Sequence, residues 1–477
     1  MRDEQRQGVL DNARYLQQVR PIDPDEIHEY VEGQPHPAVV RQILREEALG
    51  LGLRERDDGT FVPAPTGTVD VSFDGVEEFP ERYARALEEL LVAEYGPGWP
   101  DGESGDRLRA RIRSFKARYL GGGAVEYDHE TALGYAIYHL PAYYATAQYV
   151  LADLANDGRV PASPRVLDIG AGVGGPALGI NDLLPADSLV DYHAVEPSAA
   201  ADVFAELVTE TGRNFHTTIH RTTAESLDPG GEFDIVLFSN VLSELDDPVA
   251  VVERYVDALA PDGSIVALSP ADRETALQLR QVERTVEREC GLAVYAPTVR
   301  LWDDWTPGND CWSFDRQPDL AVPAFQRRLD EGTRADGVTE TDRQPGDGEF
   351  VNVDVQYAYG VWRTDGATAF DYRPNPDRTA KMGEADGHVT DRVNLAAVKL
   401  SNNLADDGNP LFLVGDGSQQ TDHFAVLTAE STLNRALLAA DYGDPLSFEN
   451  ALVLWNDDEA AYNVVVNAET VVDRIPV

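Results

Sequence analysis

Short apolar runs alternate with helix-length segments from residue 166 onward, and this alternation constrains the fold more than any other feature. Four runs precede residue 270, at Val166–Ile169, Tyr192–Val195, Ile235–Ser239 and Ile265–Leu268. Buried strands that alternate with helices are typical of a parallel sheet covered on both faces. Two later runs, Leu292–Ala296 and Val353–Trp362, predict the last strands of the same sheet.

The rest of the chain divides around this α/β region. Residues 1–125 are predicted to be a helical N-terminal region, with helices at 36–49 and 80–95 and a small hairpin at 54–62. Residues 126–363 form the sheet domain, in which 298–350 is an insertion that begins Trp-rich and ends as an acidic linker. Residues 385–477 follow the order of an OB-like β-barrel, which is three strands, a helix and two strands.

A glycine-rich motif directly follows the first strand and precedes a helix. It has the sequence Asp168-Ile-Gly170-Ala-Gly172-Val-Gly174-Gly175. Glycines allow a tight turn and a close approach of the backbone to a ligand, and the helix N-terminus offers free N–H groups. Glu196 ends the second strand, where its carboxylate is able to accept both hydroxyls of a ribose.

Two cofactors compete for this pattern, and a purely structural glycine turn is the third interpretation. The spacing satisfies the dinucleotide fingerprint, with an acidic residue further along the chain. The acidic Asp168, two residues before the first glycine, instead suits the cationic methionine end of S-adenosylmethionine (SAM). Together with Phe233-Asp234 on the fourth strand and the late strand pair, the motif resembles class I SAM-dependent methyltransferases, which have a Rossmann-like sheet.

This resemblance implies SAM as the cofactor and assigns residues to its parts. Asp168, Gly170, Gly172 and Gly174 would line the methionine and ribose, and Glu196 the ribose. The remaining expected cofactor-binding residues are Ala224 and Glu225, near adenine, and Ser239 after the fourth strand. Thr223 stands where the family usually has an acidic residue, which weakens the adenine assignment.

The segment Ser239-Asn240-Val-Leu-Ser243-Glu244-Leu245 follows the fourth strand, where substrate meets cofactor in this fold class. It lacks the Pro-Pro-aromatic tetrad typical of methylation at an exocyclic amine. It also lacks a cysteine, which excludes covalent cytosine chemistry at this position. Asn240 and Glu244 are the candidate catalytic residues, although Glu244 suits the capping of a helix equally well.

A more specific resemblance rests on several motifs in order. They are Tyr135-x-x-x-His139-x-Pro141-x-x-Tyr144, the Ser239–Leu245 segment, the Ala296-Pro297 corner leading to Asp310-Cys311-Trp312-Ser-Phe314, and Tyr357-Ala-Tyr359. Together they resemble the methyltransferase-like family of small-ribosomal-subunit assembly proteins, over about residues 125–363. The resemblance implies methylation of small-subunit rRNA or of an assembly intermediate. A non-catalytic SAM-binding assembly factor, or a methyltransferase for a small molecule or protein, remain alternatives.

The chain departs from that family at its metal site. Members often carry a cysteine cluster after the Ala-Pro corner that is able to hold an iron–sulfur cluster. Here Thr298-Val-Arg300 replaces it, and the chain has two cysteines, Cys290 and Cys311. We therefore expect no metal and no iron–sulfur cluster. The aromatic residues of the insertion are expected to pack it instead; they are Trp302, Trp305, Trp312 and Phe314.

A basic helix is predicted between residues 107 and 119. Apolar residues recur on one stripe, at Leu108, Ile112, Phe115 and Tyr119. The other positions are basic, and as candidate RNA-binding residues they are Arg107, Arg109, Arg111, Arg113, Lys116 and Arg118. Such a helix is able to lay guanidinium groups along phosphates. The alternative is a solvated face that pairs with nearby carboxylates.

Acidic residues dominate the composition. The chain has 84 Asp and Glu against 39 Lys and Arg, a net charge of −45. Hydrophobic residues still make up 43%, so the composition is that of a folded protein and resembles proteins of halophiles. With no long apolar stretch and no signal-peptide core, we expect a cytoplasmic protein. The expected partner is the small ribosomal subunit or its rRNA, with no membrane and no DNA.

Overall fold

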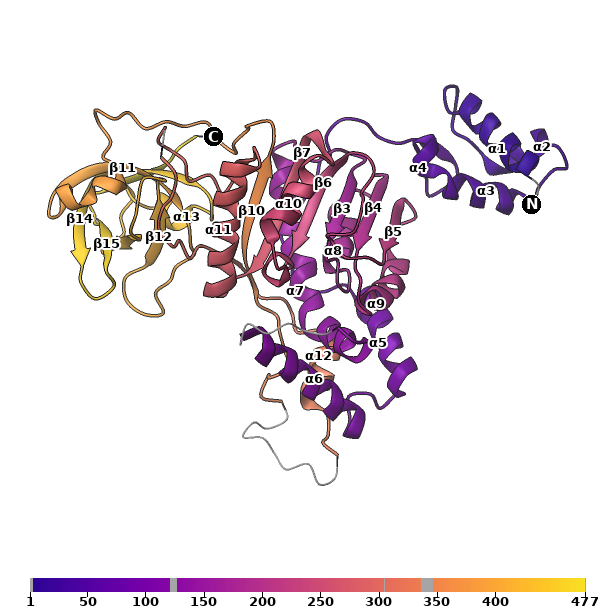
Figure 1. The fold of residues 1–477 in the computed structure, drawn as a ribbon, viewed down its shortest axis with the longest axis horizontal. Coiled ribbons are helices and arrows are strands. Elements are labelled where there is room, and N and C mark those ends of the chain that lie inside the picture. The colour runs from indigo at the N-terminus through magenta and orange to yellow at the C-terminus, as the bar shows by residue number, and fades with distance from the viewer. Residues whose placement is uncertain (1–2, 121–126, 304, 336–345, 477) are drawn as a thin grey trace. The chain divides into compact units, whose positions relative to one another are not determined.

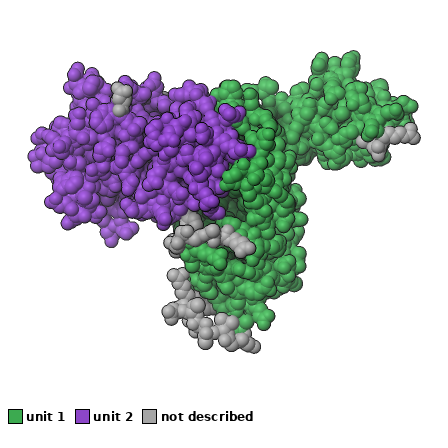
Figure 2. Space-filling view, viewed as in Figure 1, with its two compact units in different colours: residues 1–237, 258–263, 319–354 green, residues 238–257, 264–318, 355–477 purple. Residues whose placement is uncertain are grey.

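The computed structural model describes residues 3–120, 127–303, 305–335 and 346–476. These residues form two compact units (Figure 2). Unit 1 comprises Met1–Leu237, Ala258–Gly263 and Asp319–Asp354, and unit 2 comprises Phe238–Asp257, Ser264–Pro318 and Val355–Val477. The predicted domain boundary at residue 125 lies outside the described residues.

Unit 1 begins with a small helical module that has its own core. Its elements are α1 (Asp3–Leu16), α2 (Pro24–Tyr30), α3 (Pro37–Glu46), α4 (Ala48–Leu51), β1 (Leu53–Glu55) and β2 (Phe61–Pro63). Val9, Ile27, Val40 and Phe61 are buried together in it. The predicted hairpin is confirmed. The single helix predicted from 36 to 49 is instead two helices, because the first ends at Glu46.

Three longer helices follow in unit 1: α5 (Glu81–Tyr95), α6 (Gly102–Leu120) and α7 (His129–Asn156). The apolar stripe predicted on α6 is buried at Leu108, Ile112 and Phe115. Helix α7 is buried along most of its length and packs against α8 (Gly175–Leu183), the helix that follows the glycine motif.

The central sheet has the strand order β5-β4-β3-β6-β7-β10-β8, with β9 pairing β10 (Figure 1). Its strands are β3 (Arg165–Ile169), β4 (Val190–Val195), β5 (Phe215–His220), β6 (Phe233–Ser239), β7 (Leu259–Pro270), β8 (Ala293–Ala296), β9 (Asp315–Gln317) and β10 (Val355–Arg363). Strands β3, β4 and β5 are parallel, whereas β10 is antiparallel to both β7 and β8. The predicted Rossmann-like sheet is confirmed.

Helices connect the strands, as the alternation predicted. They are α8, α9 (Ala200–Leu207), α10 (Pro248–Val256), α11 (Arg273–Glu289) and α12 (Ala324–Glu331), with the short helices η1 (Val208–Glu210) and η2 (Leu242–Glu244). The strand order reverses beside β3, which has β4 on one side and β6 on the other. Ligands of open α/β sheets bind at such a reversal, beyond the carboxyl ends of the strands.

Unit 2 ends in a closed barrel. Its elements are η3 (Met382–His388), β11 (Arg392–Lys399), β12 (Leu411–Gly415), β13 (His423–Leu427), α13 (Ala436–Ala439), β14 (Pro445–Asn456), β15 (Ala461–Val466) and β16 (Val471–Arg474). The ring runs β11-β12-β13-β15-β14 and closes through β11–β14, with β13 and β15 parallel. This arrangement confirms the OB-like barrel.

The insertion differs from its prediction at both ends. Leu301 and Trp302 are buried against barrel residues, but Trp305 and Trp312 are 37% and 43% exposed, so core packing is wrong for these two side chains. The predicted acidic linker begins at Asp330, which lies in α12, is buried, and accepts hydrogen bonds from the backbone of Gly348 and Phe350.

Of the described helices, none has the length and apolarity to cross a membrane.

Candidate functional site

The glycine motif forms the turn between β3 and α8. The backbone N–H groups of Gly170 and Ala171 both donate to the carbonyl of Val195 at the end of β4, which ties the turn to the neighbouring strand. Gly172 has φ +54°, and a Cβ placed on it would meet no atom closer than 3.9 Å. The space beside Gly172 is therefore open, as a ligand would require.

Gly174 has a different role from the one predicted for it. Its φ is +90°, and an added Cβ would lie 2.2 Å from the ring of Phe204 on α9. This glycine is needed for the close packing of the turn against α9. Of the predicted cofactor-binding glycines, Gly172 therefore has open space beside it, whereas Gly174 faces the core.

Asp168 lies near the end of β3 and its side chain is fully buried. One oxygen, Oδ2, accepts a 2.6 Å hydrogen bond from the hydroxyl of Tyr192, whereas Oδ1 has no hydrogen-bond partner among the described residues. The pKa of Asp168 is raised to about 7, mainly by burial and in part by the nearby charge of Glu196, against the lowering effect of the Tyr192 hydrogen bond. A buried, unpartnered carboxylate oxygen is costly unless a ligand pairs with it.

Glu196 follows β4 and is buried against the same turn. Its Oε2 accepts the N–H of Gly172 at 2.9 Å, and its Oε1 accepts the N–H of Ser198 at 2.8 Å. These bonds fix the carboxylate, while each oxygen keeps a further lone pair for a ribose hydroxyl. Asp168 and Glu196 thus present two immobilised carboxylates to the turn, which fits a ligand with a cationic end and a ribose, as SAM has.

The predicted adenine residues lie in the turn after β5. Ala224 is buried, and the side chain of Glu225 is exposed. Both positions follow the strand that is next to β4 in the sheet. Their contact with adenine stays a prediction.

The residues predicted to act on the substrate lie in unit 2, at the end of β6. The amide of Asn240 donates to the hydroxyl of Ser239 at 3.2 Å, and the Asn240 backbone N–H donates to Leu268 of β7. Asn240 has φ +59°, a left-handed conformation that asparagine tolerates better than most residues. Glu244 lies in η2 and its backbone N–H donates to Val241. The catalytic roles of Asn240 and Glu244, and cofactor binding by Ser239, stay predictions.

Sequence reasoning missed an aromatic cluster on α7. An added Cβ on Gly175, at the start of α8, would lie 2.8 Å from the Cβ of Tyr143. The ring of His139 stacks on Tyr143, with centroids 5.3 Å apart, and Tyr135 donates from its hydroxyl to that of Tyr143. Burial lowers the pKa of His139 to about 3, so its ring is neutral at pH 7. The signal was the four-residue spacing of these three residues, which places them on one helix face.

The basic helix α6 binds mostly to its own protein. Arg107 and Arg111 pair with Glu130, and Arg113 pairs with both carboxylate oxygens of Glu349. Arg109 is fully buried and donates to the backbone carbonyls of Pro100, Leu329 and Thr333.

RNA binding by Arg109 is therefore incompatible with its position. Lys116 donates to the hydroxyl of Tyr138. RNA binding by the exposed members of the helix stays a prediction.

No three His, Cys, Asp or Glu side chains are grouped as metal ligands within the described ranges. Cys311 is buried in unit 2 and Cys290 ends α11. The expectation that the protein binds no metal or iron–sulfur cluster stays a prediction.

Comparisons with solved structures found several methyltransferases. One is the mitomycin 7-O-methyltransferase MmcR, 17% identical over 61% of this chain and 87% of that chain, with a TM-score of 0.27. Another is the plantazolicin methyltransferase BpumL in complex with SAH, 13% identical over 42% and 63%, with a TM-score of 0.25. A sugar N-methyltransferase from a Streptoalloteichus species is 22% identical over 26% and 47%, with a TM-score of 0.22. This chain spans less than two thirds of the length of the last two proteins.

A search of curated protein sequences found no match. Family models match three segments of the chain. Residues 6–57 and 383–475 match the N-terminal and C-terminal domains of a family described as a domain of unknown function, DUF8157. Residues 167–265, which run from β3 into β7, match a methyltransferase domain. The central domain is therefore that of a SAM-dependent methyltransferase.

Proposed function

We propose that this methyltransferase acts on RNA, and that the RNA belongs to the small ribosomal subunit. The observation that carries the proposal is an open groove of about 500 Å³ in unit 2, beside β11. Four of its lining side chains are basic or able to become so: Arg378, Lys381, His388 and Arg392. Two acidic residues, Asp377 and Glu384, also line it.

Two arginines of the groove are not neutralised by carboxylates of the described residues. Arg378 and Arg392 form no ion pair with a carboxylate of the described chain, and Arg392 donates to the carbonyl of Asn450. Lys381 is 4.0 Å from Glu384 and lies over the ring of the half-exposed Trp305, at 5.5 Å from its centroid. Guanidinium groups without a carboxylate partner, and a lysine over an exposed aromatic ring, suit the phosphates and bases of a single strand.

The cofactor site supports transfer to such a partner. When bound, SAM supplies an electrophilic methyl group. Asp168 and Glu196 would hold its charged and ribose ends. Asn240 and Glu244 are proposed to orient the acceptor, so that catalysis comes mainly from proximity and orientation.

The test measures RNA binding and methyl transfer separately. Anisotropy of a labelled single-stranded fragment of small-subunit rRNA gives the affinity of the full-length chain at fixed salt. We expect the double variant Arg378→Gln/Arg392→Gln to bind about tenfold or more weakly, with a shallower dependence on salt, because two phosphate contacts are lost. Arg435→Gln, an exposed barrel arginine outside the groove, should change the affinity less than twofold.

Transfer is measured with methyl-labelled SAM and purified small subunits, with transfer RNA and a protein extract as competitors. Label in small-subunit rRNA supports the proposal. Label in small molecules or protein, or equal RNA affinity of the groove variant and the Arg435→Gln control, would reject it. Binding to subunits and to SAM without transfer would identify an assembly factor that keeps SAM as a ligand.

A further inference from the structure

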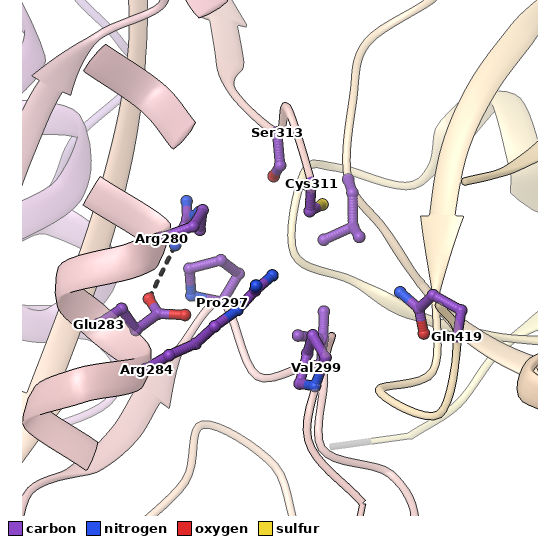
Figure 3. Close-up of a pocket in the computed structure, with 10 residues that line it drawn as sticks. Arg280, Glu283, Arg284, Pro297, Val299, Cys311, Ser313 and Gln419 are labelled. Atoms are coloured by element: carbon purple, nitrogen blue, oxygen red, sulfur yellow. Dashed lines mark hydrogen bonds and ion pairs between the residues drawn. The ribbon is translucent and has the colours of Figure 1, made fainter. Parts of the chain in front are cut away.

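A small cavity in unit 2 lies beside helix α11, between the corner at Pro297 and loops of the barrel (Figure 3). Its volume is about 20 Å³, enough for one small ion or water molecule. Apolar walls come from Pro297, Val299 and Leu400. The polar groups that point into it come from α11 and from the loop that holds Gln419, as Figure 3 shows.

Arg280 contributes a buried hydrogen-bond donor that lacks an acceptor. Its Nη1 donates to Glu283 at 2.8 Å and its Nη2 donates to the carbonyl of Tyr359 at 2.8 Å. The side chain is 6% exposed, and its Nε has no partner in the described parts of the chain. A buried N–H without an acceptor costs about 1–3 kcal/mol, and more on a charged group.

The other free groups of the cavity are also donors. The oxygen of the Gln419 amide already accepts the backbone N–H groups of Asp416 and Gly417, at 3.1 and 2.7 Å. Its NH2 end is therefore the part left for the cavity, toward which it points in Figure 3. Burial raises the pKa of the Cys311 thiol to about 12, so this side chain keeps its proton. Arg284 adds a second guanidinium, one nitrogen of which already donates to the carbonyl of Asn309.

The carboxylates nearby are already engaged. Glu283, the carboxylate that lines the cavity, pairs with Arg280 and lies 3.6 Å from Arg300. Arg300 in turn pairs with Glu287 at 2.7 Å. Of the side chains that line the cavity, two are guanidinium groups and one is a carboxylate, so the lining itself carries one surplus positive charge. Asp310 and Asp422 act on Arg284 and Cys311 from outside the lining. The site thus combines surplus positive charge with donors that lack an acceptor.

We propose that the cavity binds a small monovalent anion such as chloride, held by Arg280, Arg284 and the amide of Gln419. An anion accepts hydrogen bonds from every side and neutralises the surplus charge. A water molecule accepts only two hydrogen bonds and carries no charge, so it would leave the positive charge of the lining uncompensated. Since Arg280 and Arg284 belong to α11 and Gln419 to a barrel loop, the anion joins the last part of the methyltransferase domain to the barrel.

The test compares melting temperatures in potassium chloride and potassium glutamate at equal potassium concentration. Glutamate is too large for the cavity, so the chloride-specific gain of the full-length protein is expected to be about 2–4 °C. Arg284→Met should remove this gain. Arg288→Met, an exposed position one turn further along α11, should keep it, and so controls for the general effect of the two anions on the surface.

A second variant tests the same site in case Arg284→Met does not fold. Gln419→Glu places a carboxylate among the donors, so this protein is expected to fold and to lose the chloride-specific gain, keeping only the general difference between the two salts. Crystals of the wild type soaked in potassium bromide should show an anomalous peak beside Arg280. An equal chloride gain in Arg284→Met and Arg288→Met, or a cavity that holds water alone in bromide, would overturn the proposal.

Discussion

At the scale of single residues, the turn after β3 contains one glycine with open space beside it and another that is packed against a helix. Gly172 has open space beside it, whereas an added Cβ on Gly174 would overlap the ring of Phe204. Both belong to the same motif, and the sequence pattern assigned both to the cofactor. The burial of one side of a turn depends on the helix that packs there, and the motif does not contain that information.

Substitutions at the two glycines should therefore affect different properties, SAM binding in one case and stability in the other. Gly172→Asp is expected to fold, because aspartate tolerates positive φ, and to lose SAM binding, because a third carboxylate would occupy the space beside Asp168 and Glu196. Gly174→Ala is expected to destabilise the protein by about 1–3 kcal/mol through its clash with Phe204. Calorimetric titration of SAM and denaturant unfolding measure the two effects. Full SAM affinity in Gly172→Asp would refute the site.

Asp168 predicts a pH dependence of stability. Burial raises its pKa to about 7 in the folded chain, so the folded state holds this proton more tightly than the unfolded state does. Its contribution to stability is therefore complete at pH 4 and is lost as the pH rises through 7. Asp168→Asn removes this loss and keeps an acceptor for Tyr192.

The unfolding free energy of Asp168→Asn should equal that of the wild type near pH 4. Above pH 7 it should exceed the wild-type value by as much as about 4 kcal/mol, from roughly three pK units. The same variant should bind SAM more weakly, because the cationic end loses its carboxylate. A stability difference that does not change between pH 4 and 8 would mean that Asp168 is not the buried acid described above.

At the scale of elements, periodicity predicted the helices and buried strands well and missed the polar strands. Strand β5, with the sequence Phe-His-Thr-Thr-Ile-His, lies at the edge of the sheet and has no fully buried residue. Strand β16 pairs with β14 outside the barrel ring. Neither strand has the apolar run that marks the interior of a sheet. The spacing of basic residues on α6 likewise could not distinguish surface arginines from Arg109, two of whose acceptors, the carbonyls of Leu329 and Thr333, lie more than 200 residues further along the chain.

Arg109 and Arg107 on α6 allow the stability cost of losing a buried arginine to be compared with that of losing an exposed one. Arg109→Met should destabilise the protein by about 3 kcal/mol, because the carbonyls of Pro100, Leu329 and Thr333 lose a donor and Asp106 loses its buried partner. Arg107→Met, at a position 61% exposed and paired with Glu130, should cost less than about 0.5 kcal/mol. Denaturant unfolding of both variants at one salt concentration checks this. Equal costs would show that the Arg109 contacts do not hold the helix.

At the scale of the whole molecule, a net charge of −45 makes stability depend on salt. Repulsion among surface carboxylates is screened over about 10 Å at 0.1 M salt and about 3 Å at 1 M. The melting temperature should therefore rise steeply between 0.1 and 2 M potassium, in chloride and in glutamate alike. A melting temperature that does not change with potassium concentration would contradict this. The anion-specific gain expected at the cavity of unit 2 adds to that common rise.

The path of the chain between the two units also determines what truncation or proteolysis of the protein would yield. The backbone passes from one unit to the other five times, after Leu237, Asp257, Gly263, Pro318 and Asp354. Neither unit is a continuous segment of the gene, so no single truncation yields one without fragments of the other. A protease that cuts once between residues 319 and 354 would leave two polypeptides, each of which contributes to both units. Such a nicked protein should migrate as one species until it is denatured.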